Sequence, residues 1–183
     1  MLRISVLLNQ LINNRKNHGF SYERFFNDLF LINYMRTEQV LTIIYRRNKG
    51  KYEFLLLKRT PEKGGFWQPP SGGVESDDES ILEAAYREVY EETSISKKDV
   101  IHVFENIHSF IIEKHYITGE TQPPIKEHVY AFEVNPQATV SLDGNVYIEH
   151  TEYKWVSYEE AMKMLKWDNN KEGFEKLYLL INK

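Results

Sequence analysis

The sequence predicts an α/β protein built as a layered α/β/α domain, and three observations support this fold class. A β-branched, apolar run at 40–45 and a second expected strand at 52–57 are joined by Asn48-Lys49-Gly50, which is typical of a hairpin turn. An acidic stretch with helical periodicity follows a loop rich in glycine and proline. Further strand-like runs and two helical patterns complete the chain, and strands interspersed with helices favour layers of both.

The expected elements follow one another in order along the chain. After the hairpin, residues 60–73 form the Gly/Pro-rich loop, and a helix is expected over about 77–93. The later elements are expected to be strands at 100–112, 127–134 and 146–156, and short helices at 158–166 and 171–181.

Residues 1–35 are expected to form a helical extension that precedes the main domain, residues 36–183. Two helical patterns occur there, one in residues 2–11 and one after Ser21, which is a suitable N-cap. Asn17-His18-Gly19 marks the break between them. These helices are candidates for a homodimer contact or for another interaction.

The composition excludes several kinds of site. The 183 residues include no cysteine, which excludes disulfides and thiolate zinc sites and favours a cytoplasmic location. A net charge of −4 and a pI near 5.9 give no general attraction to nucleic acid or to an anionic membrane. Residues 1–12 are rather apolar, but Asn9 and Gln10 interrupt them, so neither a secretory signal nor a membrane span of ~20 residues is expected.

The stretch 73–95 contains the most informative pattern. It begins with a glycine-rich loop that leads directly into the expected helix. Ser76-Asp77-Asp78-Glu79 has the spacing of a capping box, with Ser76 as the N-cap and Glu79 at N3. The pattern therefore predicts a helix that starts immediately after Ser76.

Three glutamates fall on or beside the buried face of this helix. At about 100° per residue, Glu88 and Glu92 lie among the apolar residues and Glu91 lies at their edge. Their i, i+3 and i+4 spacing brings the three carboxylates together. The apolar residues of this face are Ile81, Ala84, Ala85, Val89 and Ile95.

Carboxylates that cluster on a core-facing surface repel one another and lose hydration, and a divalent cation reverses both costs. Oxygen-only ligands suit Mg²⁺, with Mn²⁺ as the alternative, and Mg²⁺ is commonly shared with substrate phosphates. The other interpretation is a solvated acidic helix. It fits less well, because the solvent face would carry Glu83, Arg87 and Tyr90 instead.

This stretch resembles the Nudix box: Gly, five residues, Glu, seven residues, Arg-Glu, an aliphatic, any residue, Glu-Glu, any residue, Gly, an aliphatic. Ser94 departs from the box, which has glycine there; a retained left-handed backbone would cost serine about 1 kcal/mol, so we expect a reshaped helix end. The resemblance implies the Nudix fold, with a mixed β-sheet, from about Arg36 onward. The matching residues are Gly73, Glu79, Arg87, Glu88, Val89, Glu91, Glu92 and Ile95.

The resemblance implies metal-binding and catalytic roles within the box. Glu88, Glu91 and Glu92 correspond to the metal-binding glutamates of the family, and Glu91 and Glu92 are counted among the catalytic residues. The backbone carbonyl of Gly72 or Gly73 is a further candidate ligand, and both glycines are candidates to contact the substrate phosphates.

Arg87 resembles the box arginine that pairs with the box glutamate, here Glu79, and braces the loop against the helix. We therefore count Arg87 with the catalytic residues. The alternative is an ordinary surface pair with Glu83 or Glu91 at i, i+4 spacing.

Nudix enzymes often use another acid from outside the box as a metal ligand or general base, and Glu127 is the candidate here. It stands at the start of the expected strand 127–134; the alternative is a surface acid at a strand end. Glu120, Glu149 and Glu152 are weaker candidates. Segments 66–68 and 149–156 resemble the bacterial dihydroneopterin triphosphate pyrophosphatase and dATP pyrophosphohydrolase branch, in which an acid stands at the position of Glu127.

Other residues are candidates for substrate contacts. Lys58 and Arg59 end an expected strand and are suited to phosphate oxygens, although an exposed strand end would look the same. Trp67, with Tyr130 or Phe132, is suited to stack on a purine or pterin, although such rings more often belong to the core. The histidines show no metal-ligand spacing, and only His128, next to Glu127, is a candidate.

The expected function is hydrolysis of a nucleoside or pterin triphosphate to a monophosphate and pyrophosphate, assisted by Mg²⁺. Rival substrates are a dinucleoside polyphosphate and ADP-ribose, whose downstream tyrosine or proline signatures are not clear here, although Tyr116 is a weak match to the first. A non-catalytic, nucleotide-sensing Nudix module is a further alternative. Such modules usually lose box glutamates, and this chain keeps them.

Overall fold

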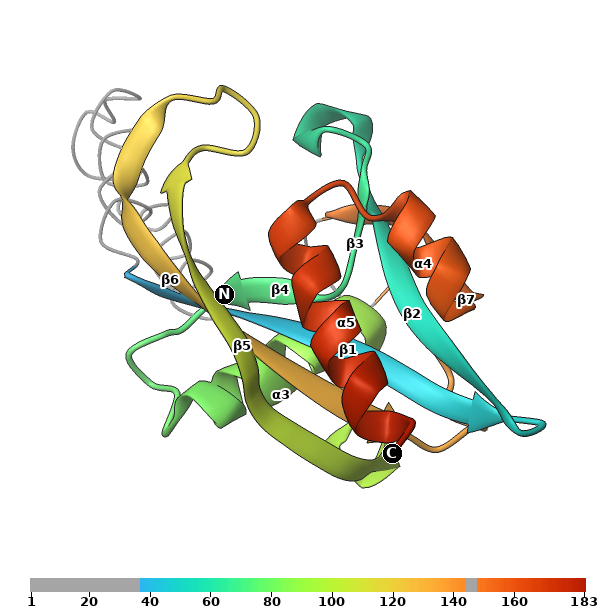
Figure 1. Cartoon of the computed structure of the whole chain (residues 1–183). Helices are drawn as coiled ribbons and strands as arrows, with labels where there is room; N and C mark the ends of the chain where they lie inside the picture. The colour runs from blue at the N-terminus through green and yellow to red at the C-terminus, as the bar shows by residue number, and fades with distance from the viewer. Residues whose placement is uncertain (1–36, 144–147) are drawn as a thin grey trace. The chain divides into compact units, whose positions relative to one another are not determined.

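The computed structural model describes residues 37–143 and 148–183 of the chain. In this part the strands form one sheet in the order β3-β2-β1-β6-β5, with β4 added to β1 and β7 added to β2 (Figure 1). The strands are β1 (Glu38–Asn48), β2 (Lys51–Arg59), β3 (Trp67–Gln68), β4 (Ser71–Gly73), β5 (Val100–Lys114), β6 (Thr121–Val134) and β7 (His150–Val156). The predicted N-terminal helices lie outside the described residues.

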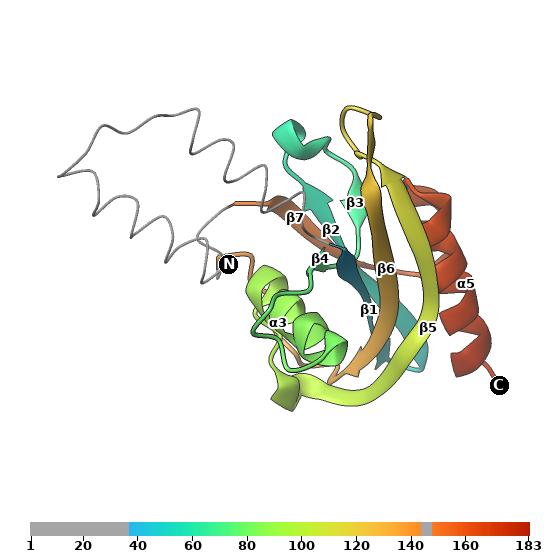
Figure 2. The same ribbon diagram turned by 90° about the vertical axis from the view of Figure 1, so that its left-hand side faces the viewer.

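The sheet is mixed, because β1 pairs with β6 in parallel and with β2 and β4 in antiparallel orientation. Helix α3 (Ile81–Thr93) covers one face, and α5 (Asp168–Ile181) covers the other, together with the short α4 (Tyr158–Met164) (Figure 2). Two short 3-10 turns, η1 (Pro61–Lys63) and η2 (Lys97–Asp99), lie in the loops. This arrangement confirms the predicted α/β/α sandwich.

The central strands are buried on both faces, which is why they read as continuous apolar runs. Val40 and Ile44 of β1 point into the core under α3, whereas Leu41 and Ile43 point into the core under α5. The predicted hairpin forms at Lys49 and Gly50, whose φ angles of 48° and 80° fit a turn with two left-handed residues.

The starts of two later strands, β6 and β7, differ from those expected. β6 begins at Thr121 rather than at Glu127, because residues 121–126 already pair with β5 across their hairpin. Backbone pairing of this kind needs no apolar side chains, so the polar sequence gave no sign of it. β7 begins at His150 within the expected segment 146–156, and residues 144–147 lie outside the described part.

The predicted start of the box helix is wrong. α3 begins at Ile81, with Ser80 as the N-cap whose hydroxyl accepts a hydrogen bond from the backbone N–H of Glu83 at 3.2 Å. Residues 76–79 belong to the loop, since the Asp78 carboxylate accepts the backbone N–H of Glu75 at 2.7 Å. Asp78 therefore forms a turn in the loop and is not part of the first helical turn.

Ser94 keeps the left-handed backbone that glycine would favour, with φ 60° and ψ 8°, so the expected reshaping of the helix end does not occur. Its N–H donates to the carbonyl of Tyr90 at 2.8 Å, which closes the helix. None of the helices in the described residues has the length and apolar character of a membrane span.

Candidate active site

The Gly/Pro-rich loop lies along the amino-terminal half of β1, directly beside α3. Backbone pairs join Gly73 to Gln39 and Ser71 to Leu41, and the N–H of Thr42 donates to the carbonyl of Pro70 at 2.9 Å. β2 pairs with β3 instead of with this half of β1. The loop therefore reaches α3 at the place where β1 and β2 separate.

Gly72 lets the Glu88 carboxylate lie directly against the loop backbone. A Cβ atom at this position would stand 2.1 Å from Cδ of Glu88, closer than any side chain tolerates. A larger residue here would displace the Glu88 carboxylate from the loop, so this glycine serves close approach of the backbone and not a left-handed angle. Both glycines named from the sequence, Gly72 and Gly73, lie at the site.

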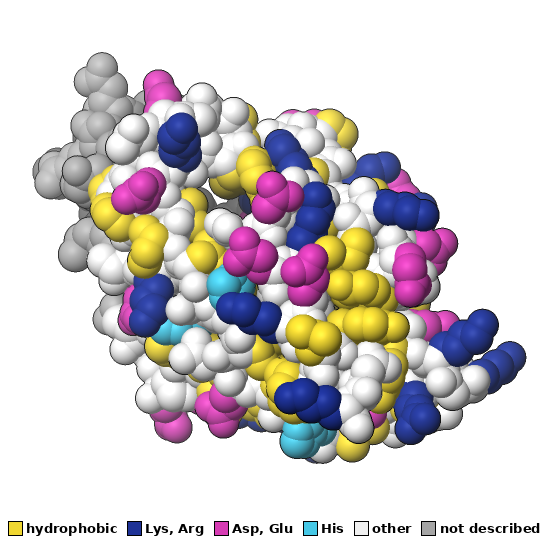
Figure 3. Space-filling view, in the orientation of Figure 1, with side chains coloured by type: hydrophobic (Ala, Val, Ile, Leu, Met, Phe, Trp, Pro, Cys, Tyr) yellow, Lys and Arg dark blue, Asp and Glu magenta, His cyan; other side chains and the backbone are white. Residues whose placement is uncertain are grey.

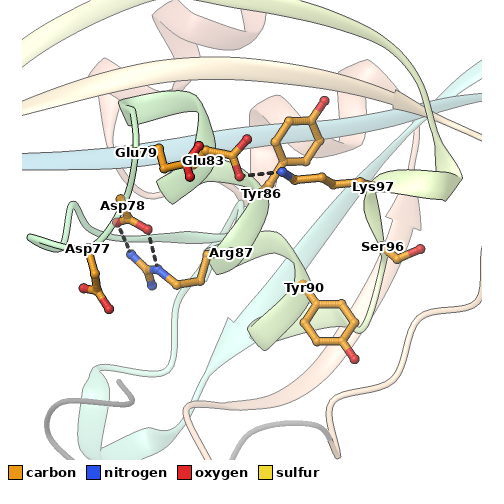
Figure 4. Close-up of a pocket in the computed structure, with 9 residues that line it drawn as sticks. All are labelled: Asp77, Asp78, Glu79, Glu83, Tyr86, Arg87, Tyr90, Ser96 and Lys97. Atoms are coloured by element: carbon orange, nitrogen blue, oxygen red, sulfur yellow. Dashed lines mark hydrogen bonds and ion pairs between the residues drawn. The ribbon is translucent and has the colours of Figure 1, made fainter.

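Arg87 fastens the loop to the helix. Its Nε and Nη2 donate to the two oxygens of Asp78 at 3.0 and 2.8 Å, and Nη2 also donates to the carbonyl of Gly73 at 2.8 Å. Nη1 donates to Oε1 of Glu88 at 2.6 Å. Figure 4 shows the guanidinium turned toward Asp78, so the partner predicted from the resemblance, Glu79, is wrong.

This network shifts two pKa values. Burial would raise the pKa of Asp78, but hydrogen bonds from Arg87 and from the backbone outweigh burial and lower it. Burial would lower the pKa of Arg87, but the nearby carboxylates of Asp78 and Glu88 outweigh burial and raise that pKa above its ordinary value. The contact is therefore ionic at any ordinary pH, and it engages the Gly73 carbonyl as well.

Glu92 is 4% exposed, and its Oε2 accepts the backbone N–H of Ser71 at 3.2 Å. Burial raises its pKa well above the ordinary value, and the charges of Glu88 and Glu149 raise it further. Burial also raises the pKa of Glu91. The charge of Arg87, whose Nη1 lies 3.6 Å from Oε2 of Glu91, partly opposes this rise. The predicted face of α3 is thus correct, since Glu88 and Glu92 are buried with Val89 and Glu91 is half-buried at the edge.

The three carboxylates do not form a ready-made cage. Within residues 37–143 and 148–183, no three acidic or histidine side chains converge closely enough to hold a metal ion. Arg87 donates to the carboxylate of Glu88, and the backbone N–H of Ser71 donates to that of Glu92. Both carboxylates are therefore directed toward donors of the protein itself. Two buried carboxylate oxygens, Oε2 of Glu91 and Oε1 of Glu127, nevertheless have no hydrogen-bond partner, and an oxygen-only donor set of this kind suits Mg²⁺.

Glu127 lies in the middle of β6 and is 4% exposed, so the alternative of a surface acid at a strand end is wrong. It pairs with Gln39 of β1, which pairs on its other side with Gly73 of β4. The three residues form one row across the sheet, so about two strand spacings, ~10 Å, separate the backbones of Glu127 and Gly73. Burial raises the pKa of Glu127 to about 8.

A buried histidine beside the box helix was not expected from the sequence. Nδ1 of His150 lies 4.0 Å from Oε1 of Glu92, and burial, together with Arg59, lowers its pKa to about 4. Arg59 itself is 8% exposed and pairs with Glu149 at 3.1 Å. Arg59 and His150 meet because they lie opposite each other where β2 pairs with β7. No local sequence pattern indicates this strand register.

Lys58 and Arg59 differ in their surroundings although they are neighbours. Lys58 points to solvent and pairs with exposed Glu152 at 2.7 Å, whereas Arg59 faces the buried carboxylates. Glu149 also pairs with Lys63 at 2.7 Å, and these cations lower its pKa against the effect of burial. Glu120 is exposed in the β5–β6 turn, so only Glu149 of the three weaker acids borders Glu92.

The aromatic residues proposed for stacking separate into two groups. Tyr130 and Phe132 are buried in the core under α3, where Phe132 packs 4.6 Å from Tyr86, so neither is available to a substrate. Trp67 is half-buried, with the ammonium groups of Lys58 and Lys154 5.8 and 5.0 Å from its ring centre. His128 bonds Glu38 at 3.1 Å and takes no part in the site.

A hollow of about 430 Å³ opens on the outer side of α3 (Figure 4). Tyr90, Lys97 and Asp77 are among its lining residues, and Lys97 pairs with Glu83 across it. Glu88, Glu91 and Glu92 are not part of the lining, so this hollow is distinct from the carboxylate site. Arg87 is shared by both sides of the helix.

The sequence profile of the NUDIX domain matches residues 35–177. This match spans most of the chain and includes the glycine loop, α3 and β6. The chain belongs to the NUDIX family. It is therefore a hydrolase that acts on phosphoanhydride bonds.

Curated relatives of this Nudix protein differ in name. It is 33% identical over 140 residues to a protein named octanoyltransferase from Myxococcus xanthus, covering 75% of this chain but 35% of that one. It therefore spans about a third of that longer relative. It is 29% identical over 151 residues to dihydroneopterin triphosphate diphosphatase of Haemophilus influenzae, covering 80% of this chain and 90% of the relative.

A solved structure of the same family is similar in fold. The Ap4A hydrolase of C. elegans, in a binary complex, superposes with a TM-score of 0.63 at 25% sequence identity. The match covers 80% of this Nudix chain and 98% of that structure. The Haemophilus diphosphatase and the C. elegans hydrolase are both matched over most of their length, and their names give different substrates.

The burial of Glu127 predicts a pH dependence of stability in metal-free buffer. The unfolded chain releases this proton near pH 4.5, but the folded chain keeps it up to about pH 8. Between these values the unfolded state binds fewer protons, so the free energy of unfolding falls as pH rises, by at most about 1.4 kcal/mol per pH unit. We expect Glu127→Gln to show a smaller fall than wild type in urea titrations from pH 5 to 8.

Glu133→Gln, a substitution in the same strand, is the matched control and should keep the wild-type slope. Glu91 and Glu92 are present in all three proteins, so the difference between them isolates Glu127. Equal slopes for Glu127→Gln and wild type would contradict the assigned burial.

Proposed function

We propose that this chain is a Mg²⁺-dependent pyrophosphohydrolase that cleaves a nucleoside-triphosphate-like substrate, a deoxynucleoside or dihydroneopterin triphosphate, to a monophosphate and pyrophosphate. The observation that carries the proposal is the buried group of box carboxylates on α3, with Glu88 held against the backbone of Gly72. Burial raises the pKa values of Glu91 and Glu92, and such buried carboxylates are costly to the fold, which favours a functional reason for them. The similarity to the Haemophilus diphosphatase supports the substrate class.

The residues proposed to hold Mg²⁺ are Glu88, Glu91 and Glu92, together with the carbonyl of Gly73. When bound there, Mg²⁺ neutralises charge on the phosphate oxygens of the substrate. The donor set fits this cation because it contains only oxygen atoms, one of which, Oε2 of Glu91, is buried without a hydrogen-bond partner.

The other residues bind and orient the substrate. Arg59 and Lys63 pair with Glu149 and bring positive charge to this region, where they are suited to phosphate oxygens. Gly72 and Gly73 leave room for phosphate to approach the loop backbone. Arg87 is a positioning residue, because its hydrogen bond fixes the carboxylate of Glu88.

Glu127 is proposed to accept the proton of the attacking water. As the water oxygen bonds to phosphorus, the bridging P–O bond of the anhydride breaks and the proton passes to the carboxylate. A carboxyl whose pKa lies near 8 is mostly protonated at neutral pH, so its surroundings must favour the ionised form before it acts as a base. A Mg²⁺ ion held by the box glutamates and the carbonyl of Gly73 would favour the ionised form.

A dinucleoside polyphosphate is the second candidate substrate. Tyr116, the weak match to that branch, reaches into the site region, where its hydroxyl lies 3.2 Å from Nη2 of Arg59. The similarity to the C. elegans Ap4A hydrolase supports this alternative. An ADP-ribose hydrolase or a non-catalytic nucleotide sensor has no comparable observation in its favour.

Glu91→Gln and Glu92→Gln should each abolish turnover with Mg²⁺ while the protein remains folded. Neutralising Glu92 removes a buried charge that Glu88 and Glu149 disfavour, so the melting temperature of the metal-free Glu92→Gln protein should not fall and is expected to rise. Activity and thermal melts measure the two effects. Glu83→Gln, on the solvent side of the same helix, is the control, and near-normal activity of either box variant would remove that glutamate from the proposed site.

Glu127→Gln should lower kcat by roughly a hundredfold or more, the scale of general-base loss, and leave KM nearly unchanged. Phosphate binding would still rest on the loop and the box glutamates. Steady-state kinetics on this variant and on Glu133→Gln give the comparison. A Glu127→Gln enzyme within threefold of wild type would transfer the base role to another acid.

A substrate panel with Mg²⁺ tests the proposed chemistry directly. dATP and dihydroneopterin triphosphate should each yield a monophosphate and pyrophosphate, which ion-exchange chromatography separates from orthophosphate. Diadenosine tetraphosphate and ADP-ribose complete the panel. A preference of about a hundredfold for either of these, equivalent to about 2.8 kcal/mol, would replace the proposed substrate class.

A further inference from the structure

A β-bulge turns His150 toward the box helix. The pairing of β2 with β7 is regular as far as Lys58, but the register then shifts, so that Arg59 lies opposite His150 and not opposite Thr151. Leu57, two residues before Arg59, packs in the core under α3, so Arg59 and His150 both lie on the α3 side of the sheet. Without the extra residue, Thr151, the side chain of His150 would face the other side. Bulges beside active sites commonly re-aim a side chain in this way.

The ring of His150 faces a carboxylate but is not tied to another group. His150 is 6% exposed, and its Nδ1 lies 4.0 Å from Oε1 of Glu92, which is beyond hydrogen-bond distance. Its Nε2 is buried without a hydrogen-bond partner in the part of the chain that the structure describes. A buried histidine that only supports the fold is normally hydrogen-bonded. A structural role therefore does not account for this ring.

A protein donor already holds one oxygen of Glu92, and the imidazole faces the other. Oε2 accepts the backbone N–H of Ser71 at 3.2 Å, whereas Oε1 is the oxygen that Nδ1 of His150 approaches. Glu92 is 4% exposed, so its ionised form needs donors in place of the water it has lost. A shift of about 1 Å would bring Nδ1 within hydrogen-bond distance of Oε1.

We propose that His150 is a positioning residue for metal binding, whose Nδ1–H donates to Oε1 of Glu92 and fixes this carboxylate between the imidazole and the Ser71 N–H. His150 itself touches neither the metal nor the substrate. Hydrogen bonds of this kind to a carboxylate ligand set its orientation and contribute to metal affinity. The inference rests on the proposed function for the role of Glu92 as a ligand of Mg²⁺.

Mn²⁺ binding without substrate, measured by electron paramagnetic resonance, tests this role without turnover. His150→Phe keeps a planar ring but removes both nitrogens, so Kd for Mn²⁺ should rise about tenfold or more, the scale for loss of such a partner. His150→Asn should restore most of the affinity, because its amide nitrogen, like Nδ1, is bonded to Cγ. His150→Gln, whose amide nitrogen lies one bond farther out, should restore less.

His108→Phe is the matched control and should leave Kd for Mn²⁺ unchanged. His108 pairs with Val129, which packs in the core under α5, and the ammonium of Lys176 lies 2.7 Å from its Nδ1. It therefore lies on the α5 side of the sheet, which faces the viewer in Figure 3, whereas α3 lies behind the sheet.

A double substitution shows whether His150 acts through Glu92. In the Glu92→Gln protein, adding His150→Phe should change Kd for Mn²⁺ by less than about twofold, because the carboxylate that the imidazole orients is gone. In steady-state kinetics with dATP, His150→Phe alone should raise the Mg²⁺ concentration for half-maximal rate about tenfold. Its kcat at saturating Mg²⁺ should stay within about threefold of wild type.

Wild-type Mn²⁺ affinity in His150→Phe would overturn the inference. A loss that His150→Asn shares in full, together with a lowered melting temperature, would also overturn it, because the ring would then only fill space. A loss that persists in the Glu92→Gln background would show that His150 does not act through that carboxylate. If Mn²⁺ binding depends on His150 as expected but no triphosphate is hydrolysed, the positioning role stands and the proposed function fails.

Discussion

The contact between Arg87 and Asp78 is the interaction on which the site depends. One guanidinium joins the loop carboxylate of Asp78, the backbone carbonyl of Gly73 and the helix carboxylate of Glu88. Its planar fork holds several acceptors at fixed angles, which a lysine ammonium cannot do. Loss of this group would leave buried carboxylates without a counter-charge, a costly state in a low-dielectric region. The loop, the helix and the position of Glu88 are therefore fixed together.

The remaining carboxylates oppose the stability of the fold. Glu92 and Glu127 are almost fully buried, and burial raises both pKa values. A core built for stability alone would place apolar residues there, as it does at neighbouring Val89 and Val129. Local conflict between burial and charge is typical of functional sites, where a ligand supplies what the folded chain lacks. The absence of a side chain at Gly72 leaves the space that the Glu88 carboxylate occupies.

The sheet and the loops serve different purposes in this protein. β1, β6 and α3 hold the acids in rigid elements, and the relatives share this framework under different names. Other side chains near the site come from connecting segments: Phe66 precedes β3, Tyr116 lies in the β5–β6 turn, and Trp167 links α4 to α5. Loops on a rigid scaffold change without disturbing the core, so the residues that distinguish substrates are expected on them. The fold is therefore common to the family, while the names of the relatives give different substrates.

The sequence by itself determined the family, the fold class and the face of α3 that carries Glu88 and Glu92, because helical period and box spacing are local properties of the chain. It did not determine the helix end, where Ser94 keeps a left-handed backbone instead of the expected reshaped end. Tertiary structure decided which residues meet: Asp78 rather than Glu79 with Arg87, and His150 beside Glu92. It also buried Glu127 and placed Phe132 in the core. These placements depend on loop conformation and on strand register, which join residues far apart in the chain and leave no periodic trace in the sequence.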